Sequence, residues 1–341
     1  MVGVFRALNQ RYKQPIAAHR QSVIFSLVAA LLLLLPLPAV ADETARRPRI
    51  GLALGGGGTR GIAHISVLRQ LEKEGIPIDC VAGTSMGAIV GGLYCAGLTP
   101  DEIEKAFRAK AFIRSYDTVP IPVRVSLIPL FFVPHLFGWH PYDGLYRGNR
   151  FAHHIDRLAA ANDKNIEDFK VPFCAVASNL LDGMPYAINK GNLGRALQAS
   201  SAIPGLRRPV PLQGQLLVDG GVVANLPVEY CRAMGADIVI AVDVDEELGH
   251  IPEHHFRKIG SVSYRCLNMH LAAIDRPQLH EADVVIHPDV AGIQLLARDI
   301  KDMDMALDEG DKAARQAIPL IHQAIDRELA KYKTPTEGKG S

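Results

Sequence analysis

Net charge, paired cysteines and tryptophan are all scarce in this chain of 341 residues. Its 37 basic and 36 acidic residues nearly cancel, so the chain lacks the bulk basic character of a nucleic-acid-binding protein and we expect no nucleic-acid partner. The five cysteines are odd in number and include no Cys-x-x-Cys pair, which argues against a disulfide framework. We interpret them as buried free thiols, because several lie in apolar stretches.

Acidic residues are missing altogether from residues 1–41. This stretch places four basic residues before an apolar run from Val23 to Leu35, and it ends in Ala39-Val40-Ala41, the small-x-small pattern of a signal-peptide cleavage site. The run is shorter than the roughly 20 apolar residues that a membrane-spanning helix needs. We therefore predict a signal peptide and an exported protein, periplasmic or secreted. An uncleaved inner-membrane anchor is the alternative.

Internal repeats are lacking too, and nothing marks a separate second domain. The length suits one large α/β domain or a domain with a tail. We place the main domain at 42–250 and a helical C-terminal extension, packed on the same domain, at 251–333. The composition of residues 334–341 predicts a disordered tail. Pro319 is expected to break the last helical stretch.

A glycine-rich loop, Gly55–Gly61, follows the first predicted strand, Ile50–Leu54, and precedes a helix whose apolar face begins at Ile62. Such a loop gathers bare N–H groups at a helix N-terminus, where negative charge is favoured. The spacing Gly-x-Gly-x-x-Gly fits a dinucleotide phosphate, with Asp79 near the position of the ribose-binding acid. The same N–H groups would also suit the oxyanion of a reaction intermediate.

Arg60 lies within this loop. Its guanidinium would either contact an anionic head group or form an ordinary ion pair, and the sequence leaves both open.

The stretch Gly83–Gly87 reads Gly-Thr-Ser-Met-Gly, between a predicted strand and a predicted helix. A serine with glycine two residues to either side is the pattern of a nucleophile elbow, a tight turn that exposes the hydroxyl of Ser85. The N–H of Met86, at the start of the helix, would face a developing oxyanion. The pattern alone also fits a glycine-rich turn with an incidental serine.

Residues 119–139 combine four prolines with many apolar and aromatic side chains, including the only tryptophan, Trp139. The prolines forbid a continuous helix. Such a segment favours a lid or a loop that contacts lipid or a membrane surface, with packing on the protein's own core or on a second subunit as the alternative. The sequence does not indicate an oligomeric state.

The second half predicts further strands, at 171–179, 215–218, 237–244 and 282–287. The β-branched strand 237–244 is expected to be central and parallel. The strand 215–218 is followed by Asp219-Gly220-Gly221. An aspartate there is either a turn residue or a placed carboxylate, and in isolation the turn is favoured.

Three signatures thus occur in order: Gly56–Gly61, Gly83–Gly87 and Asp219–Gly221. Together with the segment Ser201–Gly205 they resemble the patatin-like phospholipase family. Within it the chain is most similar to bacterial members of the branch that contains the neuropathy-target-esterase catalytic domain. The resemblance runs from about Ile50 to Val244.

The resemblance implies a three-layer α/β/α fold with a central, mostly parallel sheet, and a serine acyl hydrolase acting on phospholipids or lysophospholipids without cofactor or metal. Ser85 would be the nucleophile and Asp219 the general base of a Ser–Asp dyad. The resemblance implies that the loop N–H groups around Gly56, Gly57 and Gly58 hold the oxyanion, and the Met86 N–H joins them from its place at the start of the helix. Since an ordinary carboxylate, with a pKa of about 3.9, is a weak base for serine, we expect Asp219 to be partly buried within hydrogen-bond reach of Ser85.

Two alternatives stay open. A Ser-Asp/Glu-His hydrolase needs a histidine after the acid, and six are available: His250, His254, His255, His270, His280 and His287. A non-enzymatic module would use the glycine loop to bind a nucleotide or a lipid head group, with an idle Ser85.

Overall fold

The computed structural model describes residues 47–116, 142–159, 164–295 and 299–333. The predicted signal peptide, the apolar insert 119–139 and the tail 334–341 lie outside the described residues and stay predictions. Over the described ranges, no helix combines the length and the apolar character that crossing a membrane requires.

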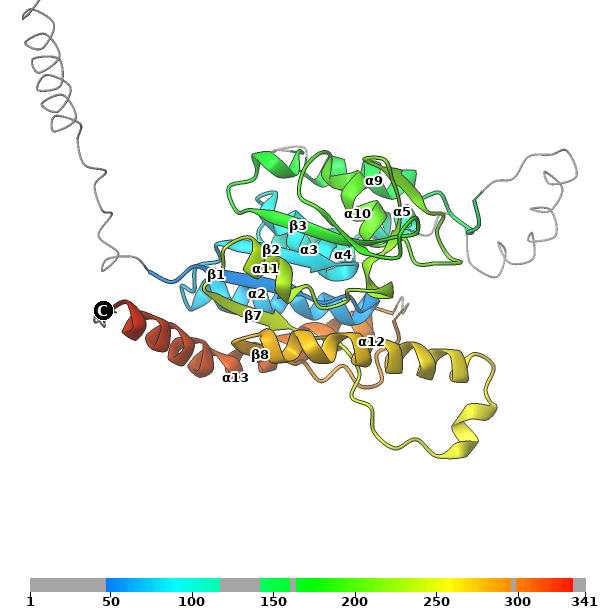
Figure 1. The fold of residues 1–341 in the computed structure, drawn as a ribbon. Coiled ribbons are helices and arrows are strands. Elements are labelled where there is room, and N and C mark those ends of the chain that lie inside the picture. The colour runs from blue at the N-terminus through cyan, green and yellow to red at the C-terminus, as the bar shows by residue number, and fades with distance from the viewer. Residues whose placement is uncertain (1–46, 117–141, 160–163, 296–298, 334–341) are drawn as a thin grey trace, which may run out of the picture. The chain divides into compact units, whose positions relative to one another are not determined.

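An eight-stranded mixed sheet forms the centre of the described structure (Figure 1). The strands are β1 (Ile50–Leu54), β2 (Cys80–Thr84), β3 (Phe173–Asn179), β4 (Pro185–Ile188), β5 (Val210–Leu212), β6 (Gln215–Asp219), β7 (Ile238–Val242) and β8 (Val284–Ile286). Their order is β5-β6-β3-β2-β1-β7-β8, and β4 also pairs with β3.

Five neighbouring strands, β3, β2, β1, β7 and β8, run parallel. The pairs β3–β4, β3–β6 and β5–β6 are antiparallel. The prediction of a central parallel strand at 237–244 is confirmed, because β7 lies between β1 and β8. The carboxyl ends of parallel strands meet at one edge of a sheet, which is where ligand sites of such folds form.

Helices cover both faces of the sheet, which confirms the expected three layers. On one side the core includes residues of α2 (Ala63–Lys73), α3 (Met86–Cys95), α4 (Pro100–Arg108), α5 (Lys110–Tyr116), α9 (Asn149–Leu158), α10 (Leu193–Ser200) and α13 (Ile300–Lys333). The other core includes residues of α11 (Val228–Ala233) and α12 (Ser261–Glu281). Strand β1 contributes side chains to both cores, since Leu52 and Leu54 lie in the first core and Ala53 lies in the second.

The long helix α13 corrects the expected break at Pro319, because it continues through this residue. A proline inside a helix removes one backbone hydrogen bond and crowds the preceding turn. Buried residues on both sides of it, including Ala314, Ala317 and Ile321, anchor the helix to the core. Tertiary packing therefore outweighs the local preference here.

The cysteines follow the sequence interpretation in part. All five are free; Cys80, Cys95, Cys174 and Cys231 are buried, whereas Cys266 on α12 is exposed.

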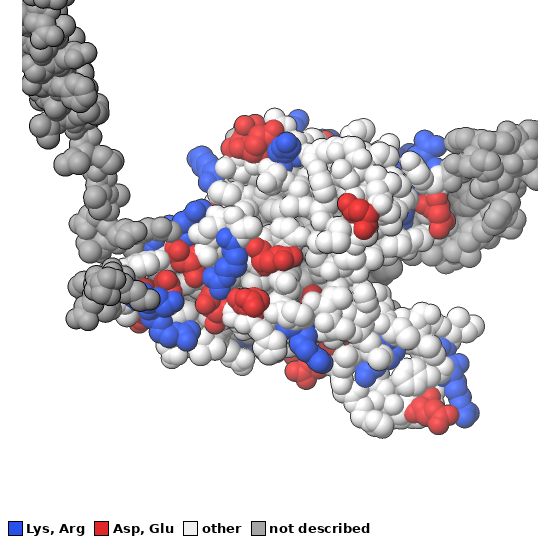
Figure 2. Space-filling view, viewed as in Figure 1, with Lys and Arg blue, Asp and Glu red and all other residues white. Residues whose placement is uncertain are grey.

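Charged side chains of both signs lie close together over the face shown in Figure 2. Ion pairs among the described residues include Arg232 with Asp283 at 2.6 Å and Arg108 with Asp304 at 2.6 Å. Exposed pairs of this kind contribute little to stability, about 0–1 kcal/mol each.

Candidate active site

Ser85 lies at the turn between β2 and α3, with a backbone φ of 52° and ψ of −115°. A positive φ is unusual for a residue with a side chain, and such a conformation costs roughly 1–3 kcal/mol. The surrounding structure must hold it in place. The predicted strand–turn–helix arrangement of a nucleophile elbow is confirmed.

Gly83 and Gly87, on either side of Ser85, lie where neighbouring backbone atoms approach too closely to leave room for a side chain. A Cβ atom on Gly83 would lie 2.6 Å from the Cα of Ala88, and one on Gly87 would overlap the carbonyl oxygen of Leu54. The start of α3 therefore packs directly against the strands, and only glycine permits this.

The backbone of the elbow is fixed by a buried serine that the sequence did not single out. Ser200 Oγ accepts a hydrogen bond from the Ser85 N–H at 2.9 Å and donates one to the carbonyl oxygen of Val176 at 2.6 Å. Ser200 is fully buried at the end of α10. It ties the strained turn to β3.

The Ser85 hydroxyl donates a hydrogen bond to Asp219 Oδ2 at 2.7 Å. Both side chains are buried, with 8 % and 7 % exposed. The expected hydrogen bond between the two is therefore present, although 134 residues separate them.

Burial raises the pKa of Asp219 to about 6, against opposing effects from the Gly221 N–H, the Ser85 hydroxyl and the charge of Arg207. The Gly221 N–H donates to Asp219 Oδ1 at 2.9 Å, which leaves Oδ2 for the serine. Above pH 6 the group is a carboxylate of raised basicity, as a general base requires.

The glycine loop, Gly55–Gly61, includes the start of the short 3-10 helix Gly58–Ile62. Some of its backbone N–H groups are hydrogen-bonded within the protein, and others have no acceptor within the described part of the chain. The N–H groups of Gly55, Thr59 and Arg60 donate to backbone carbonyls, and the Gly56 N–H donates to the Asn225 carbonyl oxygen at 3.2 Å. We therefore correct the expectation for Gly56, since its N–H is already engaged.

The N–H groups of Gly57, Gly58 and Met86 have no acceptor among the described residues. Gly58 has a φ of 54°, and a Cβ atom there would overlap the Leu295 carbonyl oxygen. The loop thus offers unencumbered donors beside Ser85, as an anion site requires.

Arg60 does not present its guanidinium as a head-group contact, because the side chain is 1 % exposed and its partners are internal. It pairs with Glu246 at 2.6 Å, donates from Nε to the carbonyl oxygen of Ile293 at 2.8 Å, and contacts Tyr264 and Asn268. The ion-pair alternative describes it. The arginine joins the glycine loop to the chain beyond β7.

A pocket opens at Ser85, with about 930 Å³ of empty space that includes open solvent. Its wall is mainly apolar and aromatic, from Ile62, Met86, Ile89, Phe107, Phe112, Tyr116, Ile203, Leu295, Ile300 and Met303. Gly58, one of the glycines with a free N–H, also lines it. A mainly apolar wall beside a polar reacting group suits an apolar ligand that carries one polar reacting group.

The histidine and nucleotide alternatives find no support in the geometry. In the part of the chain that the structure describes, no histidine hydrogen-bonds to Ser85 or Asp219; His270 bonds the Val222 carbonyl oxygen and His287 bonds Asp243. Asp79 forms two hydrogen bonds with Arg47, both at 2.7 Å, and accepts the Ile50 N–H. Its carboxylate is therefore engaged within the protein.

Comparison with known proteins identifies the class. Residues 52–232 match the family model described as patatin-like phospholipase. Because this match covers more than half of the chain, the chain belongs to the patatin-like phospholipase family.

Curated relatives include patatin-like phospholipase domain-containing protein 6 of Mus musculus, 36 % identical over 200 residues, and lysophospholipase NTE1 of Saccharomyces cerevisiae, 35 % identical over 200 residues. These matches cover 58 % and 57 % of this chain but only 14 % and 11 % of the relatives. The chain therefore corresponds to a small part of those proteins.

Matches among solved structures include VipD from Legionella pneumophila, with a TM-score of 0.44, 13 % identity and coverage of 83 % of this chain and 67 % of that one. Human GIVD cytosolic phospholipase A2 has a TM-score of 0.43, 13 % identity and coverage of 88 % and 61 %.

Proposed function

We propose that this chain is a serine acyl hydrolase that cleaves ester bonds of phospholipids or lysophospholipids. The observation that carries the proposal is the 2.7 Å hydrogen bond from the Ser85 hydroxyl to the buried Asp219 carboxylate, on a strained turn that opens into an apolar pocket. Membership of the patatin-like phospholipase family and the name of the yeast relative, a lysophospholipase, support the substrate class.

In the acylation step, Ser85 Oγ attacks the acyl carbonyl carbon while its proton passes to Asp219 Oδ2. The carbonyl oxygen becomes an oxyanion, which the N–H groups of Gly57, Gly58 and Met86 are free to bind. Each such donor is worth roughly 3–4 kcal/mol of transition-state stabilisation. The leaving alcohol takes the proton from Asp219, and the acyl group remains on Ser85.

In the deacylation step, Asp219 accepts a proton from a water molecule that attacks the acyl-enzyme. The fatty acid leaves and Ser85 recovers its proton from Asp219. The raised pKa of Asp219, about 6, suits both directions of transfer near neutral pH. The apolar wall of the pocket would hold the acyl chain.

The test is hydrolysis of lysophosphatidylcholine and of phosphatidylcholine vesicles, followed by release of free fatty acid. We expect wild type to release fatty acid and Ser85→Ala to release none above background. Ser263→Ala, the same change at an exposed serine on α12, is the matched control and should retain full activity. Equal turnover by wild type and Ser85→Ala would end the proposal.

The non-enzymatic alternative predicts a different result. A module that binds nucleotide through the glycine loop would be stabilised against heat by ATP or NAD, since a ligand that binds only the folded state raises its stability. We expect no such stabilisation, because Asp79 is held by Arg47.

Export and membrane contact are proposed from the sequence alone. N-terminal sequencing of the mature protein should begin at Asp42, and an intact N-terminus would favour the anchor. Deletion of 122–137 should lower activity on vesicles, and unchanged activity would remove a role of the insert at the membrane.

A further inference from the structure

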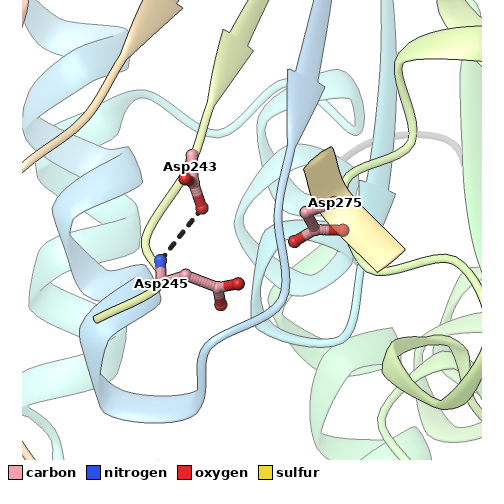
Figure 3. Close-up of side chains that lie close together, drawn as sticks. All are labelled: Asp243, Asp245 and Asp275. Carbon is pink, nitrogen blue, oxygen red and sulfur yellow. Dashed lines mark hydrogen bonds between the residues drawn. The ribbon is translucent and has the colours of Figure 1, made fainter. Parts of the chain in front are cut away.

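Three aspartates that the proposed mechanism does not use converge at the carboxyl end of β7 (Figure 3). Asp243 and Asp245 follow this strand, and Asp275 lies on α12, about 30 residues later in the chain. One oxygen from each lies within 4.8 Å of the others. The residues are buried, with 6 %, 7 % and 1 % exposed.

Two of these carboxylates have hydrogen-bond donors. Asp275 accepts from Asn225 Nδ2 at 2.7 Å and from the Leu226 N–H at 2.8 Å. Asp243 accepts from the Asp245 N–H at 3.0 Å and lies 3.1 Å from His287 Nδ1.

Asp245 is different. Its Oδ2 is buried and has no hydrogen-bond partner among the described residues, and its Oδ1 has only a long contact of 3.5 Å to Asn225 Nδ2. Figure 3 shows its carboxylate extending toward Asp275. A buried carboxylate oxygen without a hydrogen-bond donor is costly, and the positive charge of Arg60 acts on Asp245 without hydrogen-bonding to it.

We propose that Asp243, Asp245 and Asp275 bind a divalent metal cation. An all-carboxylate set of oxygen donors is the chemistry of hard cations such as Mg²⁺, Mn²⁺ and Ca²⁺. The cation would supply the missing partner of Asp245 Oδ2 and offset the repulsion among three buried carboxylates. His287 would act as an outer support that orients Asp243.

The site would be structurally linked to the glycine loop. Asp275 holds both the Asn225 side chain and the Leu226 N–H, and the Asn225 carbonyl oxygen accepts the Gly56 N–H. A cation that fixes Asp275 would therefore hold the loop through Asn225. It shares no residue with the Ser85–Asp219 pair, so it does not depend on the proposed reaction.

The competing arrangement is a shared proton. Burial, and after it the negative charge of Asp243, raise the pKa of Asp245 to about 8 and that of Asp275 to about 7, so one proton shared between Asp245 and Asp275 would relieve the repulsion without metal. The two arrangements differ in whether the protein binds a metal ion at pH 7.5.

The experiment measures Mn²⁺ binding to the full chain at pH 7.5, after treatment with EDTA and desalting, from the loss of the free-Mn²⁺ electron paramagnetic resonance signal. We expect one ion per chain, and a rise in Tm of about 5 °C when Mn²⁺ is 100-fold above its Kd. Asp245→Asn should weaken binding at least tenfold. Asp326→Asn, the same change at an exposed carboxylate on α13, should leave it unaltered.

Absence of saturable binding to wild type would overturn the proposal, and so would equal binding by wild type and Asp245→Asn. If Asp245→Asn does not fold, wild-type crystals soaked in MnCl₂ decide the question. An anomalous peak among the three carboxylates supports the site, and its absence or a peak elsewhere refutes it.

Discussion

Replacement of Asp219 by asparagine should make the protein more stable and much less active. In the folded state burial raises the pKa of this carboxyl from its ordinary 3.8 to about 6. A shift of about two units corresponds to roughly 3 kcal/mol by which the buried charge destabilises the folded state at pH 8. Asparagine carries no charge, accepts the Gly221 N–H through Oδ1 and donates to Ser85 Oγ through Nδ2, so the hydrogen bonds remain.

The sign of the effect depends on pH. Below the ordinary pKa of 3.8 the aspartate is protonated in both states, and wild type and variant should be equally stable. Between pH 3.8 and 6 the unfolded chain loses this proton while the folded state retains it, so the relative stability of wild type falls across this window and stays constant above it. At pH 8 the Tm of Asp219→Asn should exceed that of wild type by about 5 °C.

Activity should move the other way. Loss of the general base should lower kcat/KM for a p-nitrophenyl ester by about 10²–10⁴-fold. In wild type, kcat/KM should rise with pH about a midpoint near 6, and this acid limb should vanish in the variant. Differential scanning calorimetry and initial rates across pH 4–9 measure both effects, with Asp182→Asn, at an exposed turn, as control.

A variant that is less stable than wild type at pH 8 would refute the argument that the buried charge of Asp219 destabilises the folded state. A variant that keeps its activity would refute its role as the base.

Three further substitutions test the supporting structure. Ser200→Ala leaves the buried N–H of Ser85 without an acceptor, so the free energy of unfolding should fall by about 1–3 kcal/mol and kcat should fall with it; a change in neither would refute this support. Gly87→Ala should lose at least about 2 kcal/mol of stability through overlap with β1, measured by urea denaturation, whereas Gly249→Ala, in open space, should be neutral; equal effects would contradict the packing argument. Arg60→Met should lower the free energy of unfolding by about 2–4 kcal/mol, because its ion pair is lost, and should leave the head-group preference unaltered. Unchanged stability together with an altered head-group preference in lipid assays would instead indicate that Arg60 contacts the head group.

The sequence predicted the features that local chemistry determines. The strand at Ile50–Leu54, the elbow at Ser85 and the turn at Asp219 each follow from a few consecutive residues, because glycine spacing and apolar runs encode them directly. The pairing of Ser85 with Asp219 was predicted only through the resemblance, since no periodicity connects residues so far apart.

Features that depend on distant contacts escaped prediction. The Gly56 N–H is engaged by Asn225, and Arg60 is buried against Glu246; both partners lie more than 160 residues away. Ser200 looks like any serine at the end of a helix. No signal in the sequence indicates that Asp275 on α12 meets the end of β7.

The most direct test of the central claim is intact mass after incubation with a fluorophosphonate probe, which phosphonylates an activated serine. We expect one adduct on wild type, none on Ser85→Ala and much slower labelling of Asp219→Asn. No adduct on folded wild type, or an undiminished adduct on Ser85→Ala, would contradict the claim that Asp219 activates Ser85 as the nucleophile.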